Sequence, residues 1–141
     1  MRLTAGLDSG PVGLVQREPI RPEDTYGTLA ARLEAIGGEL LVRALDERPA
    51  FAEQPEAGVT YAEKIGPSDR TLDPSADPLE RVRVVRALAP HIGARMELAD
   101  GSLIGVRAAR VALDGSFEPL EVQPAGGRPM SWDDYRRGHD T

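Results

Sequence analysis

The sequence predicts an α+β protein in which helices precede a small antiparallel β-meander. Three observations support this prediction. Apolar residues recur at helical spacing over residues 29–45, and two Asp-Gly pairs separate strand-like runs after residue 94. A stretch rich in proline and glycine lies between these two patterns and is typical of a linker. The chain is therefore expected to divide into residues 1–46, a linker over residues 47–60, and residues 61–141.

The composition is that of a globular protein with an aliphatic core, because 40% of the 141 residues are hydrophobic and only 4% are aromatic. The absence of cysteine excludes a disulfide framework and a thiolate metal site. No apolar run approaches the ~20 residues of a membrane span. We therefore expect a soluble, cytoplasmic protein without a membrane partner. The net charge of −6 argues against binding nucleic acid by bulk electrostatics, although a local arginine patch can still match phosphate oxygens.

The chain begins with a glycine-bounded loop, residues 6–11, which precedes an expected strand over residues 12–16. Gly6 and Gly10, on either side of Asp8, let the backbone bend tightly and leave room for a ligand. A carboxylate held there acts as an acid or a base if its surroundings shift its pKa. The alternative is an aspartate that only accepts backbone hydrogen bonds in a turn.

Two helices are expected next. Asp24 and Thr25 offer an N-cap for the first helix, and Gly37-Gly38 is expected to end it with a left-handed cap. A second, short helix is expected over residues 40–47. Each helix has one apolar face, and the first 50 residues offer little to cover either face.

The clearest helix start is Asp77-Pro78, where Asp77 is the expected cap and Glu80 a capping-box partner. This helix is expected to end near Leu88, before a proline. The side that faces the core is expected to carry Leu79, Val82, Val85 and Leu88. Arg86 falls on nearly the same side, so its guanidinium needs either an internal salt bridge or a ligand phosphate.

The Asp-Gly pairs at residues 100–101 and 114–115 suit two-residue hairpin loops. Apolar residues change parity along the middle strand, so a bulge near Ala108-Ala109 is expected to return Val111 and Leu113 to the core. Bulged strands of this kind turn the corners of small barrels. The three strands are expected over residues 94–98, 102–113 and 117–122.

The end of the chain is expected to form a loop over residues 123–131 and a last helical turn that Ser131 caps. Common catalytic motifs are absent from the sequence. No phosphate-binding glycine loop leads into Lys-Ser or Lys-Thr, and His91 and His139 lie far apart. No metal site is therefore expected.

Five segments of the chain, taken in order, resemble the C-terminal half of the methionyl-tRNA formyltransferase family. The first looks like the catalytic-aspartate loop of that family, and the last is the most specific. The five segments are residues 5–11, 24–37, 60–65, 86–94 and 120–131.

The resemblance implies transfer of a formyl group from 10-formyltetrahydrofolate to the amino group of methionyl initiator tRNA. It assigns Asp8 the catalytic role and places Thr4, Gly6 and Asp8 at the formyl donor. Residues 1–46 would then be the C-terminal remnant of an α/β formyltransferase domain, whose catalytic Asn and His would precede residue 1. Residues 61–141 would form a tRNA-binding barrel of the oligonucleotide-binding type. The barrel would be reduced, because only Gly115 and Ser116 lie between Asp114 and Phe117, where the family commonly carries extra strands.

Four basic side chains are the candidate tRNA contacts: Lys64, Arg86, Arg110 and Arg128. Each has the alternative of a solvated surface position or a salt bridge. Three functions are compatible with the resemblance. The first is a partial formyltransferase that needs the missing N-terminal half, and the second is a non-catalytic RNA- or protein-binding module derived from that enzyme. The third, a formyltransferase for sugar nucleotides, is disfavoured by the segment over residues 123–131.

Overall fold

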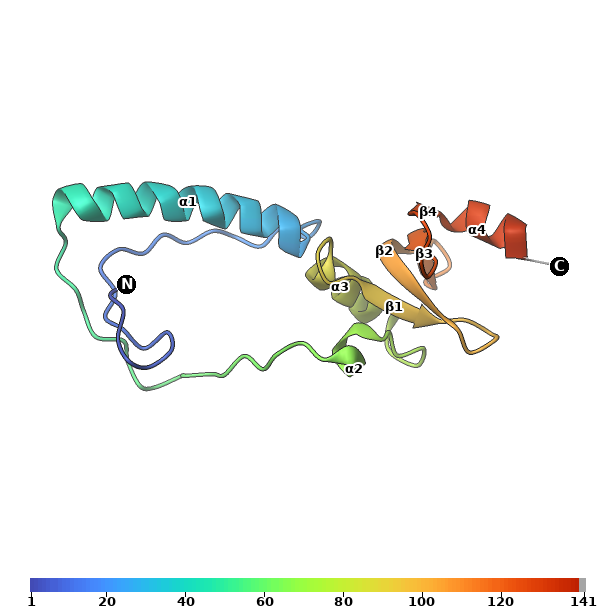
Figure 1. Ribbon diagram of the computed structural model, residues 1–141, viewed down its shortest axis with the longest axis horizontal. Coiled ribbons are helices and arrows are strands. Elements are labelled where there is room, and N and C mark those ends of the chain that lie inside the picture. The colour runs from blue at the N-terminus through green and yellow to red at the C-terminus, as the bar shows by residue number, and fades with distance from the viewer. Residues whose placement is uncertain (140–141) are drawn as a thin grey trace. The chain divides into compact units, whose positions relative to one another are not determined.

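The computed structural model of the chain describes residues 1–139, which group into two compact units (Figure 1). Unit 1 contains residues 1–22 and 29–63, and unit 2 contains residues 23–28 and the chain from residue 64 onward. The long helix α1 (Tyr26–Glu47) starts in unit 2 and continues through unit 1.

Unit 2 contains an antiparallel sheet in the order β1-β2-β3-β4, which confirms the predicted meander and the α+β class. The strands are β1 (Ala94–Glu97), β2 (Leu103–Val111), β3 (Phe117–Gln123) and β4 (Met130–Ser131). The sheet is open, so the predicted barrel is not closed. Its outer strands have only four and two residues, and the outer edge of β1 meets the rest of the chain in a single bridge between Thr71 and Arg95. Strand β4 also replaces part of the predicted loop over residues 123–131.

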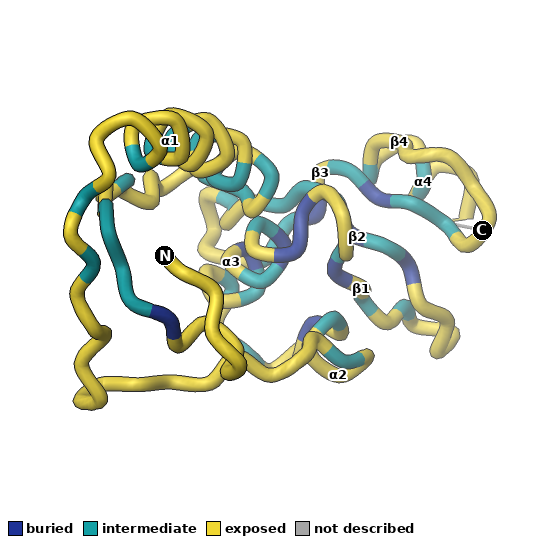
Figure 2. The backbone as a smooth tube through the Cα atoms, turned by 60° about the vertical axis from the view of Figure 1, so that its left-hand side comes forward, coloured by how far each residue is buried: buried dark blue, intermediate teal, exposed yellow. Residues whose placement is uncertain are grey.

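The core of unit 2 forms where helix α3 (Pro78–Leu88) packs on the sheet. Asp77 caps this helix as predicted, since its carboxylate accepts from the amides of Leu79 and Glu80. Glu80 pairs with Arg83 instead of reaching back as a capping-box partner, and Leu79 is 44% exposed rather than buried. The largest fully buried side chains are Val85, Ile104, Val106 and Val122. Figure 2 shows these buried stretches in α3 and the sheet.

The predicted bulge in the middle strand is confirmed. The register between β2 and β3 is irregular from Val106 to Ala109, on either side of the pair Ala108–Glu121. The irregularity lets Val106 and Ala109, which differ in parity, both face the core. The strand ends at Val111, which is 39% exposed, and Leu113 beyond it is fully exposed, so the predicted return of these two residues to the core is wrong.

The two Asp-Gly hairpins have three-residue loops and not the predicted two-residue loops. Leu98 pairs with Ser102, and Ala112 pairs with Ser116, through N–H···O bonds of 2.8 Å. Only the glycine of each loop has a positive φ, 81° at Gly101 and 84° at Gly115. A two-residue type I′ turn needs a positive φ at both central residues, whereas a three-residue loop needs it only at the glycine.

Two short helices complete unit 2: α2 (Pro67–Arg70) and α4 (Trp132–His139). Ser131 caps α4 as predicted, because its hydroxyl accepts from the Asp134 amide at 3.1 Å. On the same helix the rings of Trp132, Tyr135 and His139 stack in sequence. Among the described residues, no helix is long and apolar enough to cross a membrane.

Helix α1 is continuous over 22 residues, so the predicted break at Gly37-Gly38 is wrong. Neither glycine adopts the left-handed conformation of a helix cap. The apolar residues on both sides keep one helical period, and this pattern outweighs the cost of about 1 kcal/mol for each glycine inside a helix. None of the residues of α1 is buried.

The Asp-x-Ser turns predict how the stability of unit 2 depends on pH. The carboxylates of Asp100 and Asp114 each accept from the amide and the hydroxyl of the serine two residues later, and these bonds lower the pKa of both aspartates. A folded pKa below the unfolded value of about 3.9 stabilises the fold above that pH and loses this effect as the pH falls through the folded pKa.

We therefore expect the double variant Ser102→Ala/Ser116→Ala to have a lower Tm than the unchanged chain at pH 7, with the difference shrinking toward pH 2. Thermal unfolding followed by the fluorescence of Trp132 measures this difference. Ser68→Ala is the control, because that hydroxyl is exposed on α2 and makes no hydrogen bond with any residue from 1 to 139. A Tm difference that stays constant across this pH range would contradict the pKa argument.

Candidate functional site

The Asp8 loop is closed by its own backbone. The amide of Arg2 donates to the carbonyl of Pro11 at 2.9 Å, which brings the two ends of the loop together. Gly10 is buried at this closure, and a Cβ there would lie 1.8 Å from the carbonyl oxygen of Arg2. No larger residue therefore fits at position 10 without opening the loop.

Asp8 lies at the exposed tip of this loop, in the left-handed backbone region with a φ of 50°. Aspartate is one of the few residues that tolerates this conformation. The neighbouring hydroxyls of Thr4 and Ser9 are 3.0 Å apart. The predicted donor-binding set of Thr4, Gly6 and Asp8 is thus brought onto one loop, but all three residues are exposed. These residues do not by themselves enclose a pocket for a folate.

The loop is hydrogen-bonded to residues 51–54, a segment that the composition predicts to be a linker. Val12 and Ala52 form a two-way backbone bridge with N–H···O distances of 2.8 and 3.0 Å. The ring of Phe51 packs against the backbone of Gly13. The predicted strand over residues 12–16 is wrong, because only Val12 pairs and the one bridge does not extend.

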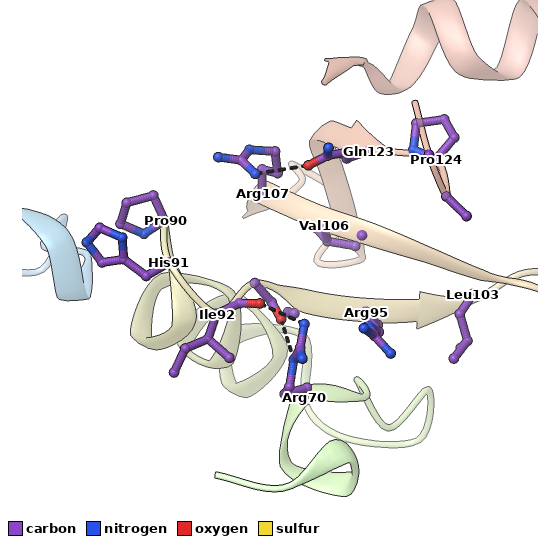
Figure 3. A pocket seen from close by; sticks show the side chains of 15 residues that line it. Arg70, Pro90, His91, Ile92, Arg95, Leu103, Val106, Arg107, Gln123 and Pro124 are labelled. Carbon is purple, nitrogen blue, oxygen red and sulfur yellow. Dashed lines mark hydrogen bonds between the residues drawn. The ribbon is translucent and has the colours of Figure 1, made fainter. Parts of the chain in front are cut away.

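A second candidate site is a groove of about 530 Å³ on the outer face of the sheet in unit 2 (Figure 3). Arg95 of β1, Gly105 of β2 and Gln123 of β3 are register partners, so they form one row across three strands. Gly105 has no side chain to fill the middle of the row, and this leaves space between the two flanking side chains. The groove is lined in addition by Arg70 and Arg107.

The guanidinium groups make this groove positive. Arg70 donates to the backbone carbonyls of Ile92 at 2.7 Å and Gly93 at 3.2 Å, so its charge is not neutralised there. Arg107 donates to the side-chain oxygen of Gln123 at 3.0 Å. No carboxylate is among the described residues that line the groove. The one carboxylate in ion-pair distance of a groove arginine among the described residues is that of Glu121, 3.9 Å from Arg107 and outside the lining. Three arginines arranged in this way are suited to an extended anion such as a phosphate backbone.

None of the four predicted tRNA contacts lines the groove. Lys64 and Arg128 are exposed in segments without regular structure. Arg110 pairs with Glu118 across the sheet at 2.6 Å, which raises the pKa of Arg110 and lowers that of Glu118. Arg86 is half-buried, and its Nε atom has no hydrogen-bond partner among the described residues.

Sequence reasoning missed Arg70, Arg95 and Arg107. The strand periodicity carried part of the signal, since Gly105 and Arg107 alternate with the core residues Ile104 and Val106 and therefore face outward. The three-residue loop sets the register that aligns Arg95 with Gly105. The sequence predicted a loop of only two residues. The approach of Arg70 depends on tertiary contacts that no local pattern indicates.

No protein-family model matches the sequence. Curated proteins do match it. Methionyl-tRNA formyltransferase of Brucella anthropi is 35% identical over 163 residues, which cover 98% of this chain and 53% of that protein. The enzyme of the same name from Ruegeria pomeroyi is 42% identical over 124 residues, covering 86% of this chain and 40% of that protein. Most of this chain is therefore similar to about half of a methionyl-tRNA formyltransferase.

The chain spans about half the length of the curated formyltransferases it matches, consistent with the C-terminal half predicted from the motifs. The alignment with the Brucella anthropi formyltransferase extends over 163 residues, more than the 141 of this chain. That relative therefore carries residues that have no counterpart here. In residues 1–139, no group of three or more His, Cys, Asp or Glu side chains could hold a metal ion.

The closure of the Asp8 loop predicts that two glycine-to-alanine changes differ in their effect on amide exchange at Arg2. Gly10→Ala places a methyl group against a backbone carbonyl that no side-chain rotation can move, so the bond between Arg2 and Pro11 breaks. We expect amide exchange at Arg2 to accelerate about tenfold, the equivalent of about 1.4 kcal/mol.

The matched control is Gly37→Ala, where nothing lies within 4 Å of the added methyl group. This change should leave exchange at Arg2 unaltered and stabilise α1 by about 1 kcal/mol. Hydrogen exchange followed by NMR measures both effects on the full chain. Equal exchange at Arg2 in the two variants would show that Gly10 does not hold the loop closed.

Proposed function

We propose that this chain supplies the Asp8 loop and the RNA-contacting domain of a methionyl-tRNA formyltransferase. The reaction moves the formyl group of 10-formyltetrahydrofolate to the amino group of methionine on initiator tRNA. The observation that carries the proposal is the match of nearly the whole chain to enzymes of this name, with Asp8 at the tip of a loop held by residues distant in sequence.

We propose that Asp8 helps to remove the proton that the attacking amine loses. An amine must lose a proton as it attacks a formyl carbon, and a carboxylate near the amine can accept that proton or orient a histidine that does so. Its exposure in this chain leaves its Oδ atoms free to face a group on another polypeptide segment. The catalytic Asn and His that the resemblance implies would lie on a polypeptide segment outside this chain.

The formyl donor requires the same missing part. Thr4, Gly6 and Asp8 offer hydroxyl, backbone and carboxylate groups on one side, but they enclose no pocket. We therefore propose that they form one wall of the donor site. Donor binding by the 141-residue chain alone is not expected.

The uncovered face of α1 is proposed to pack against that missing part. Its apolar residues recur at helical spacing, yet Leu41 is 62% exposed and Leu45 is 69% exposed. Apolar side chains in such a row contribute about 1.5–3 kcal/mol each when they become fully buried. In this arrangement residues 1–46 are the end of the catalytic domain and residues 47–60 the connection to the next domain.

Residues 61–141 are proposed to form a reduced domain of the oligonucleotide-binding type that contacts the tRNA. Its sheet is open, and the shortened loop between β2 and β3 is consistent with the loss of residues that the relatives carry. The arginine groove is the proposed contact for the phosphate backbone. Lys64 and Arg128, both exposed, remain proposed peripheral contacts, whereas the ion pair of Arg110 with Glu118 reduces its value as one.

The catalytic proposal is tested by assembly. The chain is mixed with a separately produced polypeptide covering the unmatched half of the Brucella anthropi relative, and formylation of methionyl initiator tRNA is measured. We expect activity that Asp8→Asn lowers at least about 100-fold, because general acid–base catalysis contributes roughly that much or more. Asp46→Asn, an exposed change on α1, is the charge-matched control. Absence of both association and formylation would contradict the proposal, and tRNA binding without formylation would indicate a non-catalytic module.

The groove predicts which arginines govern tRNA affinity. Arg95→Ala and Arg107→Ala should each weaken binding of initiator tRNA about fivefold or more and reduce the slope of log K against log salt concentration by about 1, if each contacts one phosphate. Arg83→Ala is the control, because Arg83 is exposed on α3 and outside the groove. Equal loss in all three variants would indicate a diffuse charge effect instead of a groove.

A further inference from the structure

We propose that Gln54 is a positioning residue for Asp8. The amide nitrogen of Gln54 lies 2.8 Å from the carbonyl oxygen of Asp8 and 2.8 Å from that of Gly10. The inference rests on the proposed function, in which Asp8 takes part in formyl transfer.

The chemistry of the contact fixes which end of the side chain faces the loop. A carbonyl oxygen only accepts hydrogen bonds, and the amide of glutamine has one NH₂ group that supplies two donors. The two hydrogens of the Gln54 NH₂ group can therefore be donated one to each carbonyl oxygen. If the side-chain oxygen of Gln54 lay there instead, it would face two acceptors and be repelled by both. No other standard neutral side chain of this length offers two donors on one atom.

Gln54 reaches the loop from a fixed base. Two residues earlier, Ala52 exchanges backbone hydrogen bonds with Val12 in both directions. The ring of Phe51 packs on Gly13, and the guanidinium carbon of Arg2 lies 4.3 Å from the centre of that ring. The backbone that carries Gln54 is therefore attached to both ends of the loop.

The two bonds determine the direction of the Asp8 side chain. The carbonyls of Asp8 and Gly10 lie on both sides of Ser9, so fixing them fixes the peptide planes through the tip of the loop. Asp8 holds a left-handed conformation that costs a non-glycine residue about 1 kcal/mol or more, and such a conformation persists only where its surroundings impose it. Gln54 provides that constraint without touching the carboxylate, which stays available for chemistry.

The test replaces Gln54 by glutamate in the full chain. The carboxylate has the same shape but no donor at pH 7, and it places negative charge against two carbonyl oxygens. We expect amide exchange at Arg2 in the Gln54→Glu variant to be about tenfold faster than in the unchanged chain. Below about pH 4 the introduced carboxyl group is protonated and regains one donor, so the difference should shrink when the chains are compared at the same pH.

Gln16→Glu is the matched control, because Gln16 is exposed in the same unit and its side chain makes no hydrogen bond with another described residue. It adds the same charge without reaching the loop. Equal exchange at Arg2 in the two glutamate variants overturns the positioning role, whatever the activity of the protein.

A second readout uses the two-part enzyme of the assembly experiment. Gln54→Glu should lower kcat about tenfold and leave KM for tRNA unchanged, and Gln54→Asn, which keeps the amide on a shorter arm, should recover part of kcat. An unchanged kcat despite a mobilised loop overturns the proposal. If the unmodified assembly is inactive, the proposed function fails, and the exchange comparison alone decides whether Gln54 orders the loop.

Discussion

Apolar burial is confined to unit 2, and this confinement governs the rest of the structure. All nine buried hydrophobic side chains of the described core lie between Leu72 and Val122, where α3 covers one face of the sheet. Unit 1 buries no large apolar side chain, so hydrogen bonds give it its order: the closure between Arg2 and Pro11, the bridge between Val12 and Ala52, and the amide of Gln54. Hydrogen bonds between groups that water also reaches contribute little net free energy. Unit 1 therefore has a specified backbone path but little stability of its own.

Because apolar side chains are buried in unit 2 and not in unit 1, the two proposed activities differ in how well their residues are held in place. The arginine groove is built on a sheet whose inner face is packed, so its side chains start from fixed positions. The Asp8 loop is held by its own backbone closure and by residues 51–54, and it faces solvent. A catalytic carboxylate needs a surrounding that excludes water and fixes its partners. Burial of the α1 face against the missing half would provide such a surrounding, whereas the groove needs no further polypeptide to present its charges.

The sequence predicted the elements with strong local signals and failed where two local signals competed. Asp77-Pro78 marked the start of α3 correctly, and the parity change in β2 located its bulge. Gly37-Gly38 resembled a helix end, but the apolar period continues across it and determines the helix. The Asp-Gly pairs identified both hairpins without fixing their loop length, and in each loop the amide of the following serine donates to the aspartate carboxylate. The role of Gln54 could not be predicted, because its partners lie 44 and 46 residues away and the surrounding composition is that of a linker.

The net charge of residues 61–141 does not describe the arginine groove, and the distribution of the ion pairs explains why. Residues 61–141 contain 11 basic and 13 acidic residues, which by itself argues against a polyanion as ligand. Several of these acids are engaged elsewhere: Glu118 holds Arg110, Asp77 caps α3, and Asp100 and Asp114 bind the amides of their own turns. Of the groove arginines, Arg70 donates to two backbone carbonyls and Arg107 to the amide oxygen of Gln123, and Arg107 also lies 3.9 Å from the carboxylate of Glu121. At a Debye length of about 8 Å in physiological salt, a phosphate in the groove interacts mainly with these nearest groups. Local arginine placement therefore outweighs the total charge in deciding whether this surface attracts a nucleic acid.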